Sequence, residues 1–159
     1  MTRKEQYNQL ILQIAELIKD ETNLVGILAN VSAALHDTFP ERFFWVGFYL
    51  QVHGNMLRLG PFQGSVACYT IPFGKGVCGK AWEEERTLIV PDVEKFPGHI
   101  ACSSLSRSEI VVPMYDDSHT FRGVLDIDST RLNDFNEDDK EGLERIIELL
   151  MEETQDLFQ

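Results

Sequence analysis

The sequence lacks any long hydrophobic run. Its longest apolar stretches, such as Phe43 to Leu50 and Ile110 to Tyr115, are far too short to cross a bilayer. Residues Met1 to Glu5 are charged and have neither the apolar core nor the small-residue cleavage site of a secretory signal. We therefore expect no membrane association and a cytoplasmic location.

Basic residues are also scarce. The chain of 159 residues has 14 Lys and Arg against 26 Asp and Glu, which gives a net charge of −12. DNA, RNA and anionic membranes would repel such a surface, so nucleic acid is disfavoured as a partner. The acidic residues concentrate after Asp134, where they predict a solvated helix face.

Cysteine is limited to Cys68, Cys78 and Cys102. An odd number in a chain without an export signal argues against a permanent disulfide framework. No Cys-x-x-Cys or His-x-x-x-His pair occurs, so we expect no structural metal site. We expect no other cofactor either.

Helical patterns open and close the chain. Apolar residues recur on one helix face from Glu5 to Lys19 and from Asn23 to Phe39, and Pro40 ends the second pattern. A third helix is predicted from Glu137 to Leu157, with Asn136 as its N-cap and Asp139 completing a capping box. Gly142 is a mild cost to that helix.

The middle of the chain predicts strands. They are expected at 43–50 and 56–59 across a turn at His53 to Asn55, then at 65–73 and 87–91, and finally at 109–115 and 122–127. A short helix is predicted over 77–84, after the break at Gly74 to Gly76, and a loop with one helical turn over 92–106. No Gly- or Ser-rich linker divides the chain. We predict a single α+β domain, residues 1–159, with helices packed on an antiparallel sheet.

Each cysteine has a reactive and an inert interpretation. Cys102 lies in the predicted loop, where a thiol near Lys95 or His99 could act as a nucleophile; the alternative is an inert small hydrophobe. Cys68 lies in a predicted strand, where the pattern favours a buried core residue about twofold over a redox group. Cys78 begins a helix, whose dipole favours a thiolate, and the position suits packing equally well.

Aromatic and acidic side chains form two further candidate groups. Trp45 and Tyr49 lie four residues apart in a strand and share a face, where they either wall a pocket or pack in the core. Asp126 and Asp128 also share a face, and Glu109 opens the preceding strand. Three carboxylates at buried strand positions suggest an ammonium site or a general acid; the alternative is capping of the next turn.

Several segments together resemble one family. They are Trp45 to Tyr49, Leu59 to Gly64, Gly74 to Gly79, Phe96 to Cys102, Ser108 to Pro113 and Gly123 to Ser129. In these segments the chain resembles the free methionine-R-sulfoxide reductases, which are stand-alone GAF domains. The resemblance covers nearly the whole chain, and it departs from the family pattern at Ser103 to Arg107 and in the hairpin Tyr115 to Phe121.

The resemblance implies a fold, an activity and residue roles. It implies a GAF-type sheet with N- and C-terminal helices packed on it, and reduction of free methionine-R-sulfoxide. Cys102 would attack the sulfoxide and become a sulfenic acid, Cys68 would resolve it as a disulfide, and a thioredoxin-type reductant would reopen that disulfide. Cys78 would be a helper or alternative resolving residue.

The same resemblance places the substrate. Glu109 and Asp128 would hold its sulfoxide oxygen or ammonium group, with Asp126 beside them, and a protonated carboxyl would supply the proton that the oxygen gains. Trp45 and Tyr49 would receive its apolar end.

Two rival functions use the same domain. A ligand-sensing GAF domain would bind a small effector without turnover, and a thiol redox switch would respond to oxidants without a dedicated substrate. The long N-terminal helices could also pair in a homodimer.

Overall fold

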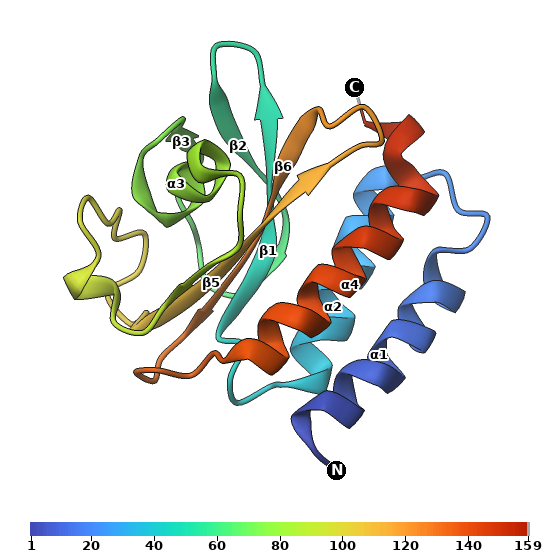
Figure 1. The fold of residues 1–159 in the computed structure, drawn as a ribbon, viewed down its shortest axis with the longest axis horizontal. Coiled ribbons are helices and arrows are strands. Elements are labelled where there is room, and N and C mark those ends of the chain that lie inside the picture. The colour runs from blue at the N-terminus through green and yellow to red at the C-terminus, as the bar shows by residue number, and fades with distance from the viewer. Residues whose placement is uncertain (159) are drawn as a thin grey trace.

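An antiparallel sheet of six strands forms the centre of the fold (Figure 1). The computed structural model describes residues 1–158. Its strands are β1 (Trp45–Val52), β2 (Met56–Gln63), β3 (Thr70–Pro72), β4 (Leu88–Val90), β5 (Ser108–Tyr115) and β6 (Phe121–Ser129). Their order across the sheet is β3-β2-β1-β6-β5-β4, and every neighbouring pair is antiparallel. The predicted α+β class is confirmed.

Helices cover both faces of this sheet. Three long helices, α1 (Arg3–Ile18), α2 (Leu24–Thr38) and α4 (Glu137–Thr154), pack together on one face (Figure 1). The short helix α3 (Gly76–Glu84) lies against the other face, and single 3₁₀ turns span Val93–Lys95 and Gln155–Leu157. In residues 1–158, none of the helices has the length and hydropathy needed to cross a bilayer.

Alternation along the strands separates a core face from a pocket face. Val46, Phe48 and Leu125 point into the core beneath α1, α2 and α4. Trp45, Tyr49 and Val124 belong to the second apolar cluster, together with residues of α3. Because side chains alternate with a period of two, every odd-numbered residue of this part of β1 faces α3.

The capping box of α4 also joins the helices. The Asn136 side chain accepts hydrogen bonds from the backbone N–H groups of Asp138 and Asp139, as predicted. The Asp139 carboxylate is fully buried and accepts hydrogen bonds from Arg3, Arg42 and the Tyr7 hydroxyl, at 2.7–2.9 Å. This arrangement anchors α1, α4 and the connection between α2 and β1 to one another.

Gly142 has a packing role in addition to its predicted mild cost to the helix. A Cβ at this position would lie 2.3 Å from Cγ of Tyr7, whose ring packs directly on the α4 backbone. The glycine is therefore required by the close approach of α1 to α4. Tyr7 in turn holds Asp139.

The predicted strand over 65–73 is wrong for most of its length. Only Thr70–Pro72 forms a strand, and residues 65–69 run as an irregular segment. Side chains of β1 hold that segment: the Trp45 indole N–H donates to the Ser65 carbonyl and the Tyr49 hydroxyl to the Cys68 carbonyl, both at 3.0 Å. These bonds satisfy carbonyl groups that a neighbouring strand would otherwise have to pair.

Candidate active site

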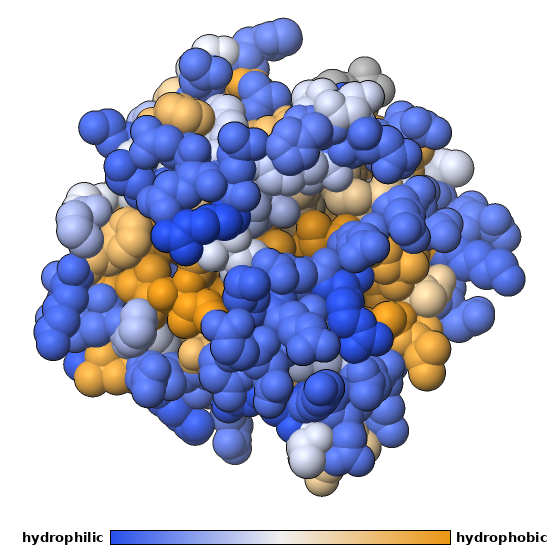
Figure 2. Space-filling view, in the orientation of Figure 1, coloured by the Kyte–Doolittle hydropathy of each residue, from blue (hydrophilic) through white to orange (hydrophobic). Residues whose placement is uncertain are grey.

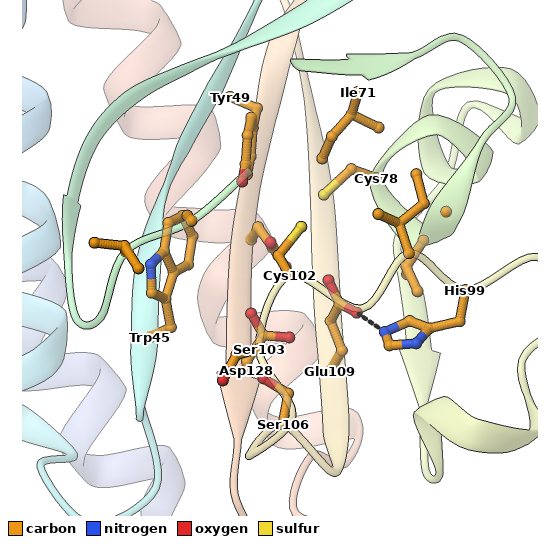
Figure 3. Close-up of a pocket in the computed structure, with 16 residues that line it drawn as sticks. Trp45, Tyr49, Ile71, Cys78, His99, Cys102, Ser103, Ser106, Glu109 and Asp128 are labelled. Atoms are coloured by element: carbon orange, nitrogen blue, oxygen red, sulfur yellow. Dashed lines mark ion pairs between the residues drawn. The ribbon is translucent and has the colours of Figure 1, made fainter. Parts of the chain in front are cut away.

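A pocket lies between α3 and the pocket face of the sheet (Figure 3). Seven of the eight predicted site residues line it, and the eighth, Cys68, is bonded to one of them. The seven are Trp45 and Tyr49 from β1, Cys78 from α3, Cys102 from the loop before β5, Glu109 from β5, and Asp126 and Asp128 from β6. Sequence segments that are far apart thus meet in one cavity.

A disulfide joins Cys68 to Cys102 at this pocket. Their Cα atoms are 5.4 Å apart, and both residues are partly exposed. The interpretation of Cys68 as a buried core residue is therefore wrong, and so is that of Cys102 as an inert hydrophobe. Partly exposed cysteines that form a disulfide in a small pocket are accessible both to a substrate and to an external thiol.

Three carboxyl groups form the polar side of the pocket. Glu109 pairs with Asp128 across the β5–β6 ladder, and Asp126 lies two residues along the same face, as predicted. Glu109 and Asp126 are buried, and Asp128 is partly exposed. The Oδ1 atom of Asp126 is buried without a hydrogen-bond partner among the described residues. The turn-capping interpretation does not fit, because these groups point into a cavity.

Burial dominates the electrostatics of the three carboxyl groups. It raises the pKa of Glu109 and of Asp128 well above the usual carboxyl range, and the nearby charge of Asp126 raises both further. Burial also raises the pKa of Asp126, but hydrogen bonds with the Glu109 carboxyl and the Cys78 thiol oppose that effect. The three interacting carboxyl groups therefore release their protons at higher pH than exposed carboxyl groups do.

Cys78 is the free thiol of this site. It is buried in α3, and burial raises the pKa of its thiol well above the ordinary value, with Asp126 and Glu109 adding to the effect. The thiolate that the helix dipole would favour is thus disfavoured by desolvation. Cys78 Sγ and carboxylate oxygens of Glu109 and Asp126 lie within 4.8 Å of one another, a donor set that could hold a metal ion.

His99 is a pocket residue that the sequence analysis named only as a neighbour of Cys102. Its Nε2 atom lies 3.9 Å from Oε1 of Glu109 (Figure 3). Burial lowers the pKa of His99, and the charge of Asp126 acts in the opposite direction. Lys95, the other basic residue named beside Cys102, is exposed and does not line the pocket. In the sequence, only its position three residues before Cys102 indicates that His99 could belong to the pocket.

Aromatic side chains form the apolar wall. The rings of Trp45 and Tyr49 stack with centroids 5.9 Å apart, and the ring of Phe62 also stacks with Trp45, at 5.1 Å. Both Trp45 and Tyr49 also hold the segment that carries Cys68. Trp45 and Tyr49 therefore both line the pocket and position Cys68, one of the two disulfide cysteines.

These groups define a type of chemistry. A thiol pair can deliver two electrons by becoming a disulfide, and a carboxyl group that stays protonated can give its proton to an oxygen atom. An apolar wall opposite carboxyl groups suits a small molecule with one apolar and one cationic end. The site is that of a thiol oxidoreductase acting on a small polar molecule.

Comparison with known proteins identifies the family. The family model described as GAF domain matches residues 20–151, and the chain belongs to that family. A GAF domain-containing protein A from Dictyostelium discoideum is 56% identical over 94% of this chain and 92% of its own length. A free methionine-R-sulfoxide reductase from Saccharomyces cerevisiae is 42% identical over 94% of this chain and 86% of its own length.

A solved structure agrees with these relatives. The free methionine-R-sulfoxide reductase of Neisseria meningitidis, in complex with its substrate, is 46% identical and superposes with a TM-score of 0.93, covering 98% of this chain and 92% of that one. Within the GAF domains, the chain belongs to the free methionine-R-sulfoxide reductases, a family of oxidoreductases.

Proposed function

We propose that this protein reduces the R epimer of free methionine sulfoxide to methionine, with Cys102 as nucleophile and Cys68 as resolving residue. The observation that carries the proposal is the Cys68–Cys102 disulfide, which adjoins a pocket with an aromatic wall and buried carboxyl groups. The family supports the substrate and its stereochemistry.

Substrate binding follows from the two sides of the pocket. The methyl end of the substrate contacts the rings of Trp45 and Tyr49, which lie on one side (Figure 3). The ammonium group lies by Asp126, whose buried Oδ1 lacks a hydrogen-bond partner among residues 1–158. A cation there stabilises a carboxylate that burial destabilises. A substrate without a free amine loses this interaction.

Reduction then proceeds in two balanced steps. The Cys102 sulfur attacks the sulfoxide sulfur and forms an S–S bond, while Glu109 or Asp128 donates a proton to the oxygen. The hydroxyl group then passes from the substrate sulfur to the Cys102 sulfur: the substrate S–O bond and the S–S bond break, an S–O bond forms on Cys102, methionine leaves and Cys102 is a sulfenic acid. The proton of the Cys102 thiol returns to the carboxyl group. The Cys68 thiol next attacks the Cys102 sulfur, a disulfide forms and water leaves.

Two further parts of the proposal concern the protein's surroundings. A thioredoxin-type dithiol reopens the disulfide and allows the next turnover. Pairing of the N-terminal helices in a homodimer and a cytoplasmic location remain predictions. Cys78 retains the role of a helper, because its thiol contacts the Asp126 carboxylate.

The test is thioredoxin-coupled oxidation of NADPH with three substrates: the R and S epimers of free methionine sulfoxide, and the N-acetylated R epimer. The proposal expects turnover of the free R epimer alone, and none with Cys102→Ser. The N-acetylated R epimer should not turn over, because it lacks the ammonium group that Asp126 binds.

The rival functions give different results. A folded, reduced protein that binds the R epimer without turnover is a ligand-sensing GAF domain. A protein whose disulfide forms equally fast with peroxide and with methionine sulfoxide is a redox switch. Either result refutes the proposed enzyme.

A further inference from the structure

Exposed apolar side chains flank both cysteines of the disulfide. Val66 and Tyr69 lie on either side of Cys68 and are 87% and 76% exposed, and Leu105, three residues after Cys102, is 58% exposed. We call Val66, Tyr69 and Leu105 the disulfide flank. Large apolar side chains cost free energy when water surrounds them, and the disulfide brings the two segments that carry them together at one reactive bond.

The two segments that carry the disulfide differ in charge from the rest of the chain. Residues 42–82 and 96–108, which carry Cys68 and Cys102, contain none of the 26 Asp and Glu residues. Their charged residues are basic, among them the exposed Arg58, Lys75 and Arg107. Because the chain has a net charge of −12, it repels acidic proteins as a whole. These two segments are where we expect that repulsion to be weakest.

We propose that the disulfide flank is the docking surface for an acidic protein dithiol reductant, whose redox-active face is apolar with a negatively charged rim. This inference rests on the proposed function, which requires the disulfide to be reopened. The flank would contact the apolar face of the reductant, and Arg107 its acidic rim. A small dithiol needs neither contact.

The electron transfer at this surface is balanced. A thiolate of the reductant attacks one sulfur of the Cys68–Cys102 disulfide; a mixed disulfide forms, and the displaced cysteine leaves as a thiolate and takes up a proton. The second thiol of the reductant then attacks the mixed disulfide. Both cysteines of this protein end as thiols, and the reductant ends as a disulfide.

The first test compares two electron donors for the double variant Tyr69→Ser/Leu105→Ser. With an acidic thioredoxin, its reductase and NADPH, we expect the KM for thioredoxin to rise about tenfold, the size of effect that truncating a central interface residue produces. With dithiothreitol as donor, kcat and the KM for methionine sulfoxide should match the wild type.

Leu12→Ser is the matched control, because Leu12 is a similarly exposed leucine, at 71%, on α1 in the opposite helical layer. It should leave the KM for thioredoxin unchanged. A normal KM for thioredoxin in the double variant would overturn the docking surface, and so would an equal rise in Leu12→Ser.

The second test addresses charge. Arg107→Glu should raise the KM for thioredoxin severalfold at low salt and less at high salt, since screening weakens long-range attraction. Lys4→Glu, an exposed reversal on α1, should have a much smaller effect. Equal effects of the two reversals would refute the inference.

The dithiothreitol assay separates this inference from the proposed function. If dithiothreitol supports reduction of methionine sulfoxide and the flank variants leave the KM for thioredoxin unchanged, only the docking surface fails. If dithiothreitol supports no turnover in the wild type, the proposed function itself fails.

Discussion

The hydroxyl of Tyr49 should control how fast the disulfide forms. It donates a hydrogen bond of 3.0 Å to the carbonyl of Cys68, in an irregular segment that joins the sheet only where the Tyr69 carbonyl accepts from Leu59 of β2. A neutral hydrogen bond of this kind contributes about 0.5–1.5 kcal/mol, which corresponds to about a 2- to 13-fold change in population. Tyr49→Phe keeps the ring and removes this bond. We therefore expect Cys68 to resolve the sulfenic acid about 2- to 13-fold more slowly.

The measurement is a single turnover of reduced protein with excess methionine sulfoxide, stopped at successive times. Methionine release reports the attack by Cys102, and loss of dimedone-reactive sulfenic acid reports the attack by Cys68. Methionine release should be unchanged in Tyr49→Phe, while the sulfenic acid persists longer. Burial raises the pKa of Tyr49 far above that of an ordinary phenol, so its hydroxyl donates throughout the assay's pH range.

Tyr115→Phe provides the matched control. The Tyr115 hydroxyl is buried and has no hydrogen-bond partner among residues 1–158, so its removal should alter neither step. If sulfenic acid disappears at the wild-type rate in Tyr49→Phe, the positioning role of Tyr49 is refuted. Slowing of equal size in Tyr115→Phe would refute it as well.

Three further substitutions test the site and its support. Glu109→Gln should lower kcat by about 10²- to 10⁴-fold if Glu109 is the proton donor. Because the pKa of Glu109 is raised in the folded state, the wild type loses stability as the pH rises above the pKa of the unfolded chain. Gln does not titrate, so the melting temperature of the variant should increase relative to that of the wild type from pH 5 to pH 8. Cys78→Ser should retain the Cys68–Cys102 disulfide, seen by mass spectrometry, and lose less than about tenfold in kcat, since a hydroxyl can still donate to Asp126. Gly142→Ala should lower the free energy of unfolding, measured in urea, by about 1–3 kcal/mol, because the added Cβ clashes with Tyr7. Helix propensity alone predicts the opposite, a stabilisation of about 1 kcal/mol. A measured stabilisation would therefore contradict the packing argument.

Much of the pocket could be predicted because strands impose a simple rule. Alternation placed Trp45 with Tyr49 and Asp126 with Asp128 on common faces, and the structure confirms both pairs. The antiparallel hairpin then brought Glu109 opposite Asp128. The capping box at Asn136 was equally predictable, because it depends on residues three positions apart.

Features that depend on long-range packing were missed. The Ser65 to Tyr69 segment has strand-like composition, but hydrogen bonds from Trp45 and Tyr49 and the disulfide at Cys68 hold it out of the sheet. Local propensity carries no information about such partners. For the same reason, a glycine that is unfavourable within its own helix proved necessary once Tyr7 packed against it.

The spacing of the cysteines also could not predict which two of them form the disulfide. The spacing in the chain allows any two of Cys68, Cys78 and Cys102 to pair, and only the family resemblance favoured Cys68 with Cys102. In the folded chain, Cys78 lies in the buried face of α3, while the other two lie in irregular segments. The fold, and not the spacing, decides which thiols meet.

The disulfide closes a stretch of 34 residues that includes β3, α3 and β4. In a chain-entropy treatment, such a crosslink stabilises a folded protein by about 3–4 kcal/mol. The proposed cycle therefore alternates between a less stable reduced form and a more stable oxidised form. When reductant is scarce, the molecules that accumulate are those most resistant to heat and proteolysis, so the pool of enzyme survives the shortage and resumes work once dithiols return.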